Sequence, residues 1–94
     1  MASLRNLKKG INYLVDEVIG TCMLHKYARG QQEHEELDQL IHEMVEYRES
    51  LLNRVNNPEL EDKGRSMKAY YRGLLDELLE KVNSAFDKVN ATAN

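Results

Sequence analysis

Apolar residues recur every three or four positions along this chain, in three separate stretches. In the first stretch they fall within about 100° of arc on a helical wheel, the width of a stripe that faces a core. They are Leu4, Leu7, Ile11, Leu14, Val15, Val18 and Cys22. Ser3 precedes them where a capping residue belongs, and Gly30 follows where a glycine in left-handed geometry ends a helix. We expect a helix over residues 4–29.

The second stretch repeats this pattern after Gly30. Its stripe consists of Leu37, Leu40, Ile41, Met44, Leu51, Leu52 and Val55. Glu33, Glu35 and Glu36 lie in the first turn, where negative charge complements the helix dipole. The spacing predicts a helix over residues 32–56.

The third stretch follows the segment NNPEL, in which Asn57 can cap a helix and Pro58 suits its first position. The pattern predicts a helix over 58–90, with one alternative left open. Gly64 interrupts the pattern and Ser66 can cap a new start, so that 58–64 would form a separate turn. One apolar seam of this helix consists of Met67, Tyr71, Leu74, Leu78, Ala85 and Val89, and a second of Leu75, Leu79, Val82 and Phe86.

Three long amphipathic segments joined by short loops predict an all-α, antiparallel three-helix bundle, with residues 1–94 as one domain. The composition agrees, since 41% of the residues are hydrophobic, 31% are charged and only one is proline. Charge is unevenly distributed: residues 31–62 carry ten acidic and two basic side chains, whereas the segments before and after are mildly basic. Such a balance helps to choose which helices become neighbours.

The stretches LKKGINYLVDEVIG and AYYRGLLDELLEKVNSAFDKVN, with the proline turn between them, resemble an uncharacterised family of short all-helical bacterial proteins over most of the chain. The resemblance implies a bacterial helical protein and transfers no site residue, because that family has no assigned function.

The amino-terminal segment lacks the continuous apolar core of a signal peptide, and a lone cysteine forms no internal disulfide. We expect a cytoplasmic protein without a membrane segment.

A candidate metal site lies on either side of Gly30. A chain reversal there brings His25 near His34 and Cys22 near Asp38, and one thiolate, two imidazoles and a carboxylate form an acceptable tetrahedral zinc set. The competing interpretation is structural, because Cys22 lies at the centre of the first apolar stripe and His25 near the end of the same helix. The structural interpretation is favoured, since the spacing is less specific than paired Cys-x2-Cys motifs.

Catalysis and nucleic-acid binding have weaker support. A core-centred Cys22 is the opposite of an exposed, low-pKa nucleophile, and the sequence has no P-loop, catalytic triad or HExxH motif, so we expect no enzyme activity, cofactor or small-molecule substrate. Lys63, Arg65, Lys68 and Arg72 form a basic cluster beside two tyrosines, but the net charge of −3 opposes binding to a polyanion.

Two features raise the question of a protein partner. Arg48 lies near the middle of the second stripe, where it must either pair with a carboxylate, such as Glu17 or Glu77, or extend outward along its apolar stem. The functional alternative is a contact between Arg48 and an acidic group of a partner. If the second seam of the third helix, Leu75, Leu79, Val82 and Phe86, is not covered within the monomer, it forms an apolar contact strip. We therefore expect an interaction module that forms a homodimer through the third helix or captures another protein.

Overall fold

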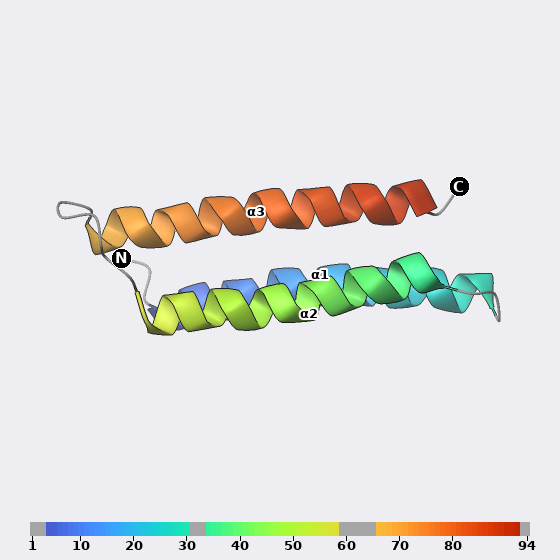
Figure 1. Cartoon of the computed structure of the whole chain (residues 1–94), viewed down its shortest axis with the longest axis horizontal. Coiled ribbons are helices and arrows are strands. Elements are labelled where there is room, and N and C mark those ends of the chain that lie inside the picture. Colours follow the sequence, from blue (N-terminus) through green and yellow to red (C-terminus); the bar gives the residue numbers. More distant parts are fainter. Residues whose placement is uncertain (1–3, 31–33, 59–65, 93–94) are drawn as a thin grey trace.

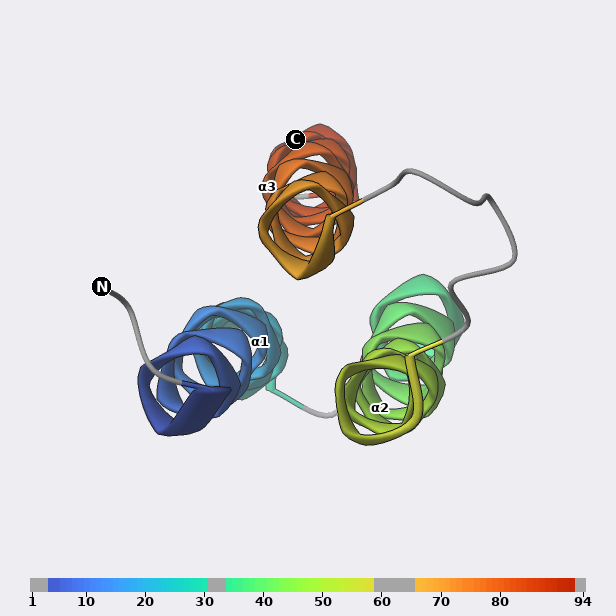
Figure 2. The same ribbon diagram turned by 90° about the vertical axis from the view of Figure 1, so that its left-hand side faces the viewer.

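The structure, a computed structural model, describes residues 4–30, 34–58 and 66–92. Three helices account for almost all of them: α1 (Leu4–Arg29), α2 (Glu35–Asn56) and α3 (Met67–Thr92). The described residues contain no strand. α2 runs antiparallel to α1, and α3 runs antiparallel to α2 and therefore parallel to α1 (Figure 1). Viewed end-on, the helices form a triangle (Figure 2), and each contacts both others. The all-α three-helix bundle predicted from the sequence is confirmed.

The helix bounds differ from expectation mainly at the two later starts. α2 begins at Glu35 rather than at residue 32. α3 begins at Met67 rather than at residue 58, and Pro58 belongs to no helix. The Oγ of Ser66 accepts a hydrogen bond from the backbone N–H of Ala69 at 3.0 Å, which is the geometry of an N-cap. The alternative start at Ser66 therefore describes the third helix, while residues 59–65 lie outside the described part.

The reversal between α1 and α2 depends on Gly30. Its φ angle is +77°, the left-handed conformation that glycine adopts without strain, and its N–H donates to the carbonyl of Tyr27 at 3.2 Å. His34 then binds back across the turn, with its Nε2 3.0 Å from the carbonyl oxygen of Gly30. The predicted helix-ending glycine is therefore confirmed.

The core consists of the apolar stripes of the three helices. α1 contributes Ile11, Val15, Val18 and Cys22; α2 contributes Leu37, Leu40, Met44, Leu51 and Val55; α3 contributes Tyr70, Leu74, Leu78, Val82, Ala85 and Val89. No charged side chain of the described residues is buried. The core is thus uniformly apolar and leaves every ionic contact at the surface.

Two tyrosines fasten the end of α2 to the beginning of α3. The hydroxyl of Tyr70 donates to the carbonyl of Arg54 at 3.0 Å, and that of Tyr71 donates to the carbonyl of Val55 at 3.2 Å. Carbonyls in the last turn of a helix have no partner within the helix, so these bonds satisfy groups that would otherwise need water. Both tyrosines pack between α2 and α3. They are therefore not placed to stack on nucleic-acid bases beside the predicted basic cluster.

Arg48 has a different partner from the two that the sequence suggested. Its Nη1 lies 2.7 Å from the Oδ1 of Asp16 on α1, whereas Glu77 pairs with Arg54 instead. The guanidinium therefore extends outward along its apolar stem and bridges α2 to α1 at the surface. This contact accounts for Arg48 within the monomer.

Candidate functional site

The predicted contact strip of α3 divides into an exposed and a buried part. Leu75 and Leu79 remain 39% and 44% exposed, and Phe86 is half-buried. Val82 is only 4% exposed and belongs to the core, which corrects its assignment to a partner-binding surface. It lies closer on the helical wheel to the core stripe, about 60° from Leu79, and the other helices cover it.

Apolar residues of α1 extend the exposed part of the strip. The ion pairs of Asp16 and Lys26 with α2 mark the side of α1 that faces α2. A 100° step per residue places Leu14 on the side toward α3, whereas Tyr13 and Leu24 lie about 170° and 150° from the centre of the core stripe and point to the solvent. Tyr13 is 64% exposed and Leu24 is 69% exposed.

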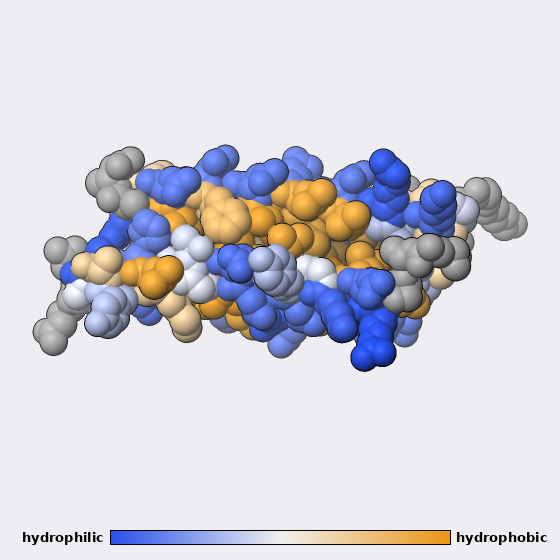
Figure 3. Space-filling view, turned by 180° about the vertical axis from the view of Figure 1, so that it is seen from behind, coloured by the Kyte–Doolittle hydropathy of each residue, from blue (hydrophilic) through white to orange (hydrophobic). Residues whose placement is uncertain are grey.

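We call the side of the bundle made by α1 and α3 the α1–α3 face. Its members are Tyr13, Leu14 and Leu24 of α1 together with Leu75, Leu79 and Phe86 of α3. Figure 3 views the molecule from this side and shows apolar surface running along the seam between α3 above and α1 below. Exposed apolar side chains that gather on one side of a small protein are a feature of contact sites.

The α1 half of this face is also nearly free of charge. On the side turned toward α3 and solvent, α1 presents Asn6, Gly10, Tyr13, Leu14, Glu17, Thr21, Leu24 and Ala28. Glu17 is the single charged residue among them, in a chain in which 31% of the residues are charged. Depletion of charge is a feature of the centres of protein interfaces. Sequence reasoning missed this half, although the missing charges along one side of the predicted helix were a readable signal.

A polar cluster holds α2 against α3 on another side of the bundle. Both Tyr47 and Arg54 donate to Oε2 of Glu77, at 3.0 Å and 2.7 Å respectively, and the amine of Lys81 lies 5.6 Å from the centre of the Tyr47 ring. The hydrogen bond from Arg54 is the main cause that lowers the pKa of Glu77. Burial, followed by the hydrogen bond to Glu77, raises the pKa of Tyr47. Every member has a partner, so the cluster is a structural contact between two helices.

The four candidate zinc ligands do not form a group in the structure. Cys22 is fully buried in the core, and burial raises the pKa of its thiol. The raised pKa disfavours the thiolate, which is the form that binds a metal or attacks a substrate. Asp38 pairs with Lys26. The Nδ1 atom of His34 is buried without a hydrogen-bond partner among the described residues. Across the described ranges, no cluster of three or more His, Cys, Asp or Glu side chains could hold a metal ion.

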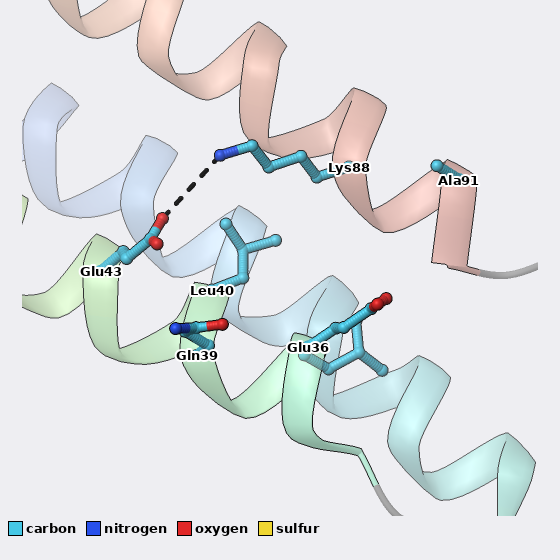
Figure 4. A pocket seen from close by; sticks show the side chains of 7 residues that line it. Glu36, Gln39, Leu40, Glu43, Lys88 and Ala91 are labelled. Atoms are coloured by element: carbon cyan, nitrogen blue, oxygen red, sulfur yellow. Dashed lines mark ion pairs between the residues drawn. The ribbon is translucent and has the colours of Figure 1, made fainter.

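A shallow groove of about 300 Å³ lies between α2 and α3 near the end of the bundle. Leu37, Leu40 and Ala91 supply its apolar lining, and polar side chains surround them. One of these, Lys88, reaches toward Glu43 at 3.9 Å, as Figure 4 shows. The groove is open and lies at the lower limit of the volumes that small-molecule sites occupy. Every polar group that the described residues provide in the groove is also accessible to solvent.

Two further expectations concern membranes and nucleic acid. Within the described part of the chain, no helix is both long and apolar enough to cross a bilayer. Of the predicted basic cluster, Lys68 and Arg72 are exposed on α3, while Lys63 and Arg65 lie outside the described residues.

Comparison of the chain with protein-family models, curated proteins and solved structures found no match. Any statement about function therefore depends on the chain's own surface.

Proposed function

We propose that this protein is a non-enzymatic helical interaction module that self-associates through the α1–α3 face. The observation that carries the proposal is the exposure of Leu75 and Leu79 on α3 together with that of Tyr13 and Leu24 on the outward side of α1. The sequence predicted a contact strip on α3 alone, whereas the proposed surface includes side chains of both α1 and α3. A cytoplasmic location, which the sequence predicts because no signal-peptide pattern is evident and the single cysteine agrees with a reducing compartment, suits such a role.

The size of the face supports a specific dimer. The helices of 26 residues are about 39 Å long at 1.5 Å per residue, and a layer two helices wide measures about 20 Å across. The flat area of this whole side of the bundle is therefore roughly 780 Å², an upper limit that just reaches the ~800 Å² that each partner contributes to a standard protein interface. A smaller face would support only a transient contact.

The energetic gain follows from the exposed fractions. Complete burial of a leucine side chain contributes about 1.5–3 kcal/mol, so covering the exposed 44% of Leu79 contributes about 1 kcal/mol per copy. Leu24, which is 69% exposed, contributes somewhat more. A small bundle has a modest core of its own, and association adds stability that the monomer lacks.

Light scattering after size-exclusion chromatography tests this function. We expect wild-type protein to be dimeric at high micromolar concentration. Leu79→Glu should weaken the dimer at least ~10- to 100-fold, because each interface loses two apolar contacts and must accommodate two carboxylates. Met23→Glu is the matched control, since Met23 is 58% exposed on the α2 side of α1 and outside the face. A monomeric wild type, or equal effects of the two substitutions, would show that the face has no such role.

A further inference from the structure

We propose that the α1–α3 face also binds an amphipathic helix of another protein, which lies antiparallel to α1 and α3 and displaces the second copy. This inference rests on the contact face of the proposed function and names a partner for it. The partner helix carries a lysine or arginine in its N-terminal half and an aspartate or glutamate about eleven residues later. Docking of a helix along an exposed apolar strip is a recurring mode of protein recognition.

Ion pairs from α2 to both neighbours show how α1 and α3 are aligned along the bundle. Arg48 contacts Asp16 of α1, and Arg54, six residues later on α2, contacts Glu77 of α3. Because α3 runs antiparallel to α2, the level of Asp16 is that of Asn83, six residues after Glu77. The ion pairs of α2 nearer the other end of the bundle give the same alignment. The level of any residue of α3 can therefore be compared with α1 to within about one turn.

The charges on the face are arranged with opposite signs along its length. On the helical wheel, Lys68 and Arg72 lie on the face near the N-terminal ends of α1 and α3, whereas Glu17 lies on it about 18 Å from Arg72 along the bundle. All three are exposed, and none forms an ion pair within the described residues. Asp76 and Asp87 lie on the outer rim of α3, one on each side of Leu79, and so favour neither direction.

A second copy leaves Glu17 without a cation. In an antiparallel two-fold dimer that covers the whole face, α1 packs on α1 of the copy, and Glu17 in the middle of α1 approaches its own counterpart. In a parallel two-fold dimer α1 packs on α3 of the copy, where the exposed charges at the level of Glu17 are Glu80 and Asp87. Like charges disfavour both arrangements by a small amount. A helix of another protein is free of this symmetry and can present a cation to Glu17.

The helix dipoles select the direction of the partner. α1 and α3 are parallel, so their N-terminal ends, each with a partial positive charge, lie at the same end of the bundle as Lys68 and Arg72 (Figure 1). The C-terminal end of the partner has the opposite partial charge and fits there, together with an acidic side chain. Its N-terminal half then lies beside Glu17. Eleven residues, about three turns, span about 17 Å and keep both charged groups on one side of the partner helix.

Apolar side chains between the two charged levels provide the contact area. Leu75 and Leu79 of α3 lie there and are 39% and 44% exposed. Leu14 of α1 lies beside them and is half-buried. Gly10 of α1 lies between the levels of the two exposed leucines, and no atom occupies the space where a side chain would project from it. A partner helix can therefore approach α1 closely at this point.

Two synthetic peptides test the inference with the wild-type protein. Both are amphipathic helices of about 20 residues with leucine at the contact positions, long enough to cover about 30 Å. The matched peptide has lysine in its N-terminal half and glutamate about eleven residues later, and the exchanged peptide has these two residues reversed. In fluorescence anisotropy the matched peptide should bind about five- to twenty-fold more tightly, because two exposed ion pairs replace two like-charge contacts. High salt should reduce this difference.

A charge-reversed face is the matched variant. Glu17→Lys combined with Lys68→Glu and Arg72→Glu should invert the preference, so that the exchanged peptide binds more tightly. The three residues are exposed, and circular dichroism checks that the fold is retained. Leu79→Glu should weaken the binding of both peptides at least ~10-fold, whereas Met23→Glu, outside the face, should change it by less than about two-fold.

A nitroxide label on the N-terminus of the matched peptide tests the direction. In amide NMR spectra it should broaden the signals of Thr21 and Asn90, which lie near that end of the docked helix. The signals of Asn6 and Arg72 should be much less affected, because they lie about 22 Å or more away along the bundle. Stronger broadening at Asn6 and Arg72 would contradict the antiparallel direction.

The outcomes separate this inference from self-association. Equal affinities of the two peptides, or a preference that the charge-reversed variant retains, would overturn the proposed partner. Failure of both peptides to bind a protein that is dimeric by light scattering would overturn the partner and leave self-association intact. A monomeric wild type that binds the matched peptide supports the partner and contradicts self-association. If the protein is dimeric, the matched peptide should lower its mass to that of one chain with one peptide; a dimer that persists at saturation would contradict displacement.

Discussion

The ion pair of Glu77 with Arg54 predicts a defined pH dependence of stability. Arg54 Nη1 donates to Glu77 Oε2 at 2.7 Å, and the hydrogen bond is the main cause of the lowered carboxyl pKa. A carboxyl group whose pKa is lower in the folded state stabilises the fold above its unfolded pKa of 4.5. This stabilisation is lost as the pH falls through the lower, folded value. The sign is therefore fixed: Glu77 favours folding at neutral pH and contributes nothing in strong acid.

The magnitude follows from the exposure of the pair. The two side chains are 42% and 43% exposed, so solvent screens their attraction and the ion pair contributes about 0.5–1 kcal/mol. Glu77→Gln removes the charge but keeps an oxygen that accepts from Tyr47. We expect this variant to be about 0.5–1 kcal/mol less stable than wild type at pH 7. Unfolding entropy of about 0.2 kcal/mol/K for 94 residues converts this into a melting temperature lower by about 3–5 °C.

Thermal unfolding followed by circular dichroism, at one fixed protein concentration, measures this difference at pH 7 and at pH 2.5. The difference between wild type and Glu77→Gln should be smaller at pH 2.5 than at pH 7, because more of the Glu77 carboxyl groups are then protonated. Glu49→Gln is the control, because Glu49 is exposed and forms no ion pair within the described residues. A difference that stays constant on acidification, or an equal effect of the control, would refute the assignment of a stabilising ion pair to Glu77.

Three further predictions concern the turn, the core and the thiol. Gly30→Ala should destabilise the protein by about 1 kcal/mol in urea titrations, because an alanine is strained at a φ angle of +77°. Gly20→Ala is the control: Gly20 lies inside α1 with open space around it, so this substitution should stabilise the protein by about 0.5–1 kcal/mol. Met44→Ala should cost about 2–5 kcal/mol by the same measurement, since Met44 is fully buried between the helices. Cys22 should react with a thiol reagent only as fast as the protein unfolds, and chelators should leave the melting temperature unchanged. Rapid labelling of Cys22, or a melting temperature lowered by a chelator, would contradict the assignment of Cys22 to the core.

The fold could be predicted from the sequence because the core residues repeat with the helical period. Ile11, Val15, Val18 and Cys22 already define the buried side of α1, and Gly30 marks its end through a conformation that other residues avoid. The start of α3 was harder to locate. Pro58 and Ser66 are both credible helix-start residues, and local propensity does not decide between them.

The candidate surface could be predicted only in part. A helical wheel shows that Leu75, Leu79, Val82 and Phe86 share one side of α3, but how far a neighbouring helix covers that side depends on its rotation in the bundle. Val82 is therefore buried while Leu79 remains exposed. The partner of Arg48 was uncertain for a related reason. A long side chain reaches carboxylates on several turns, and in the structure the one that Arg48 contacts is Asp16.

Sedimentation equilibrium of the wild-type protein tests the central claim most directly. The account predicts a mass that rises with concentration from 10.9 kDa to about twice that value and then stays there, because an isologous contact closes at two copies. Leu79→Glu should remain at 10.9 kDa over the same range. A wild-type mass of one chain at high micromolar concentration, or a mass that keeps rising beyond two chains, would contradict it.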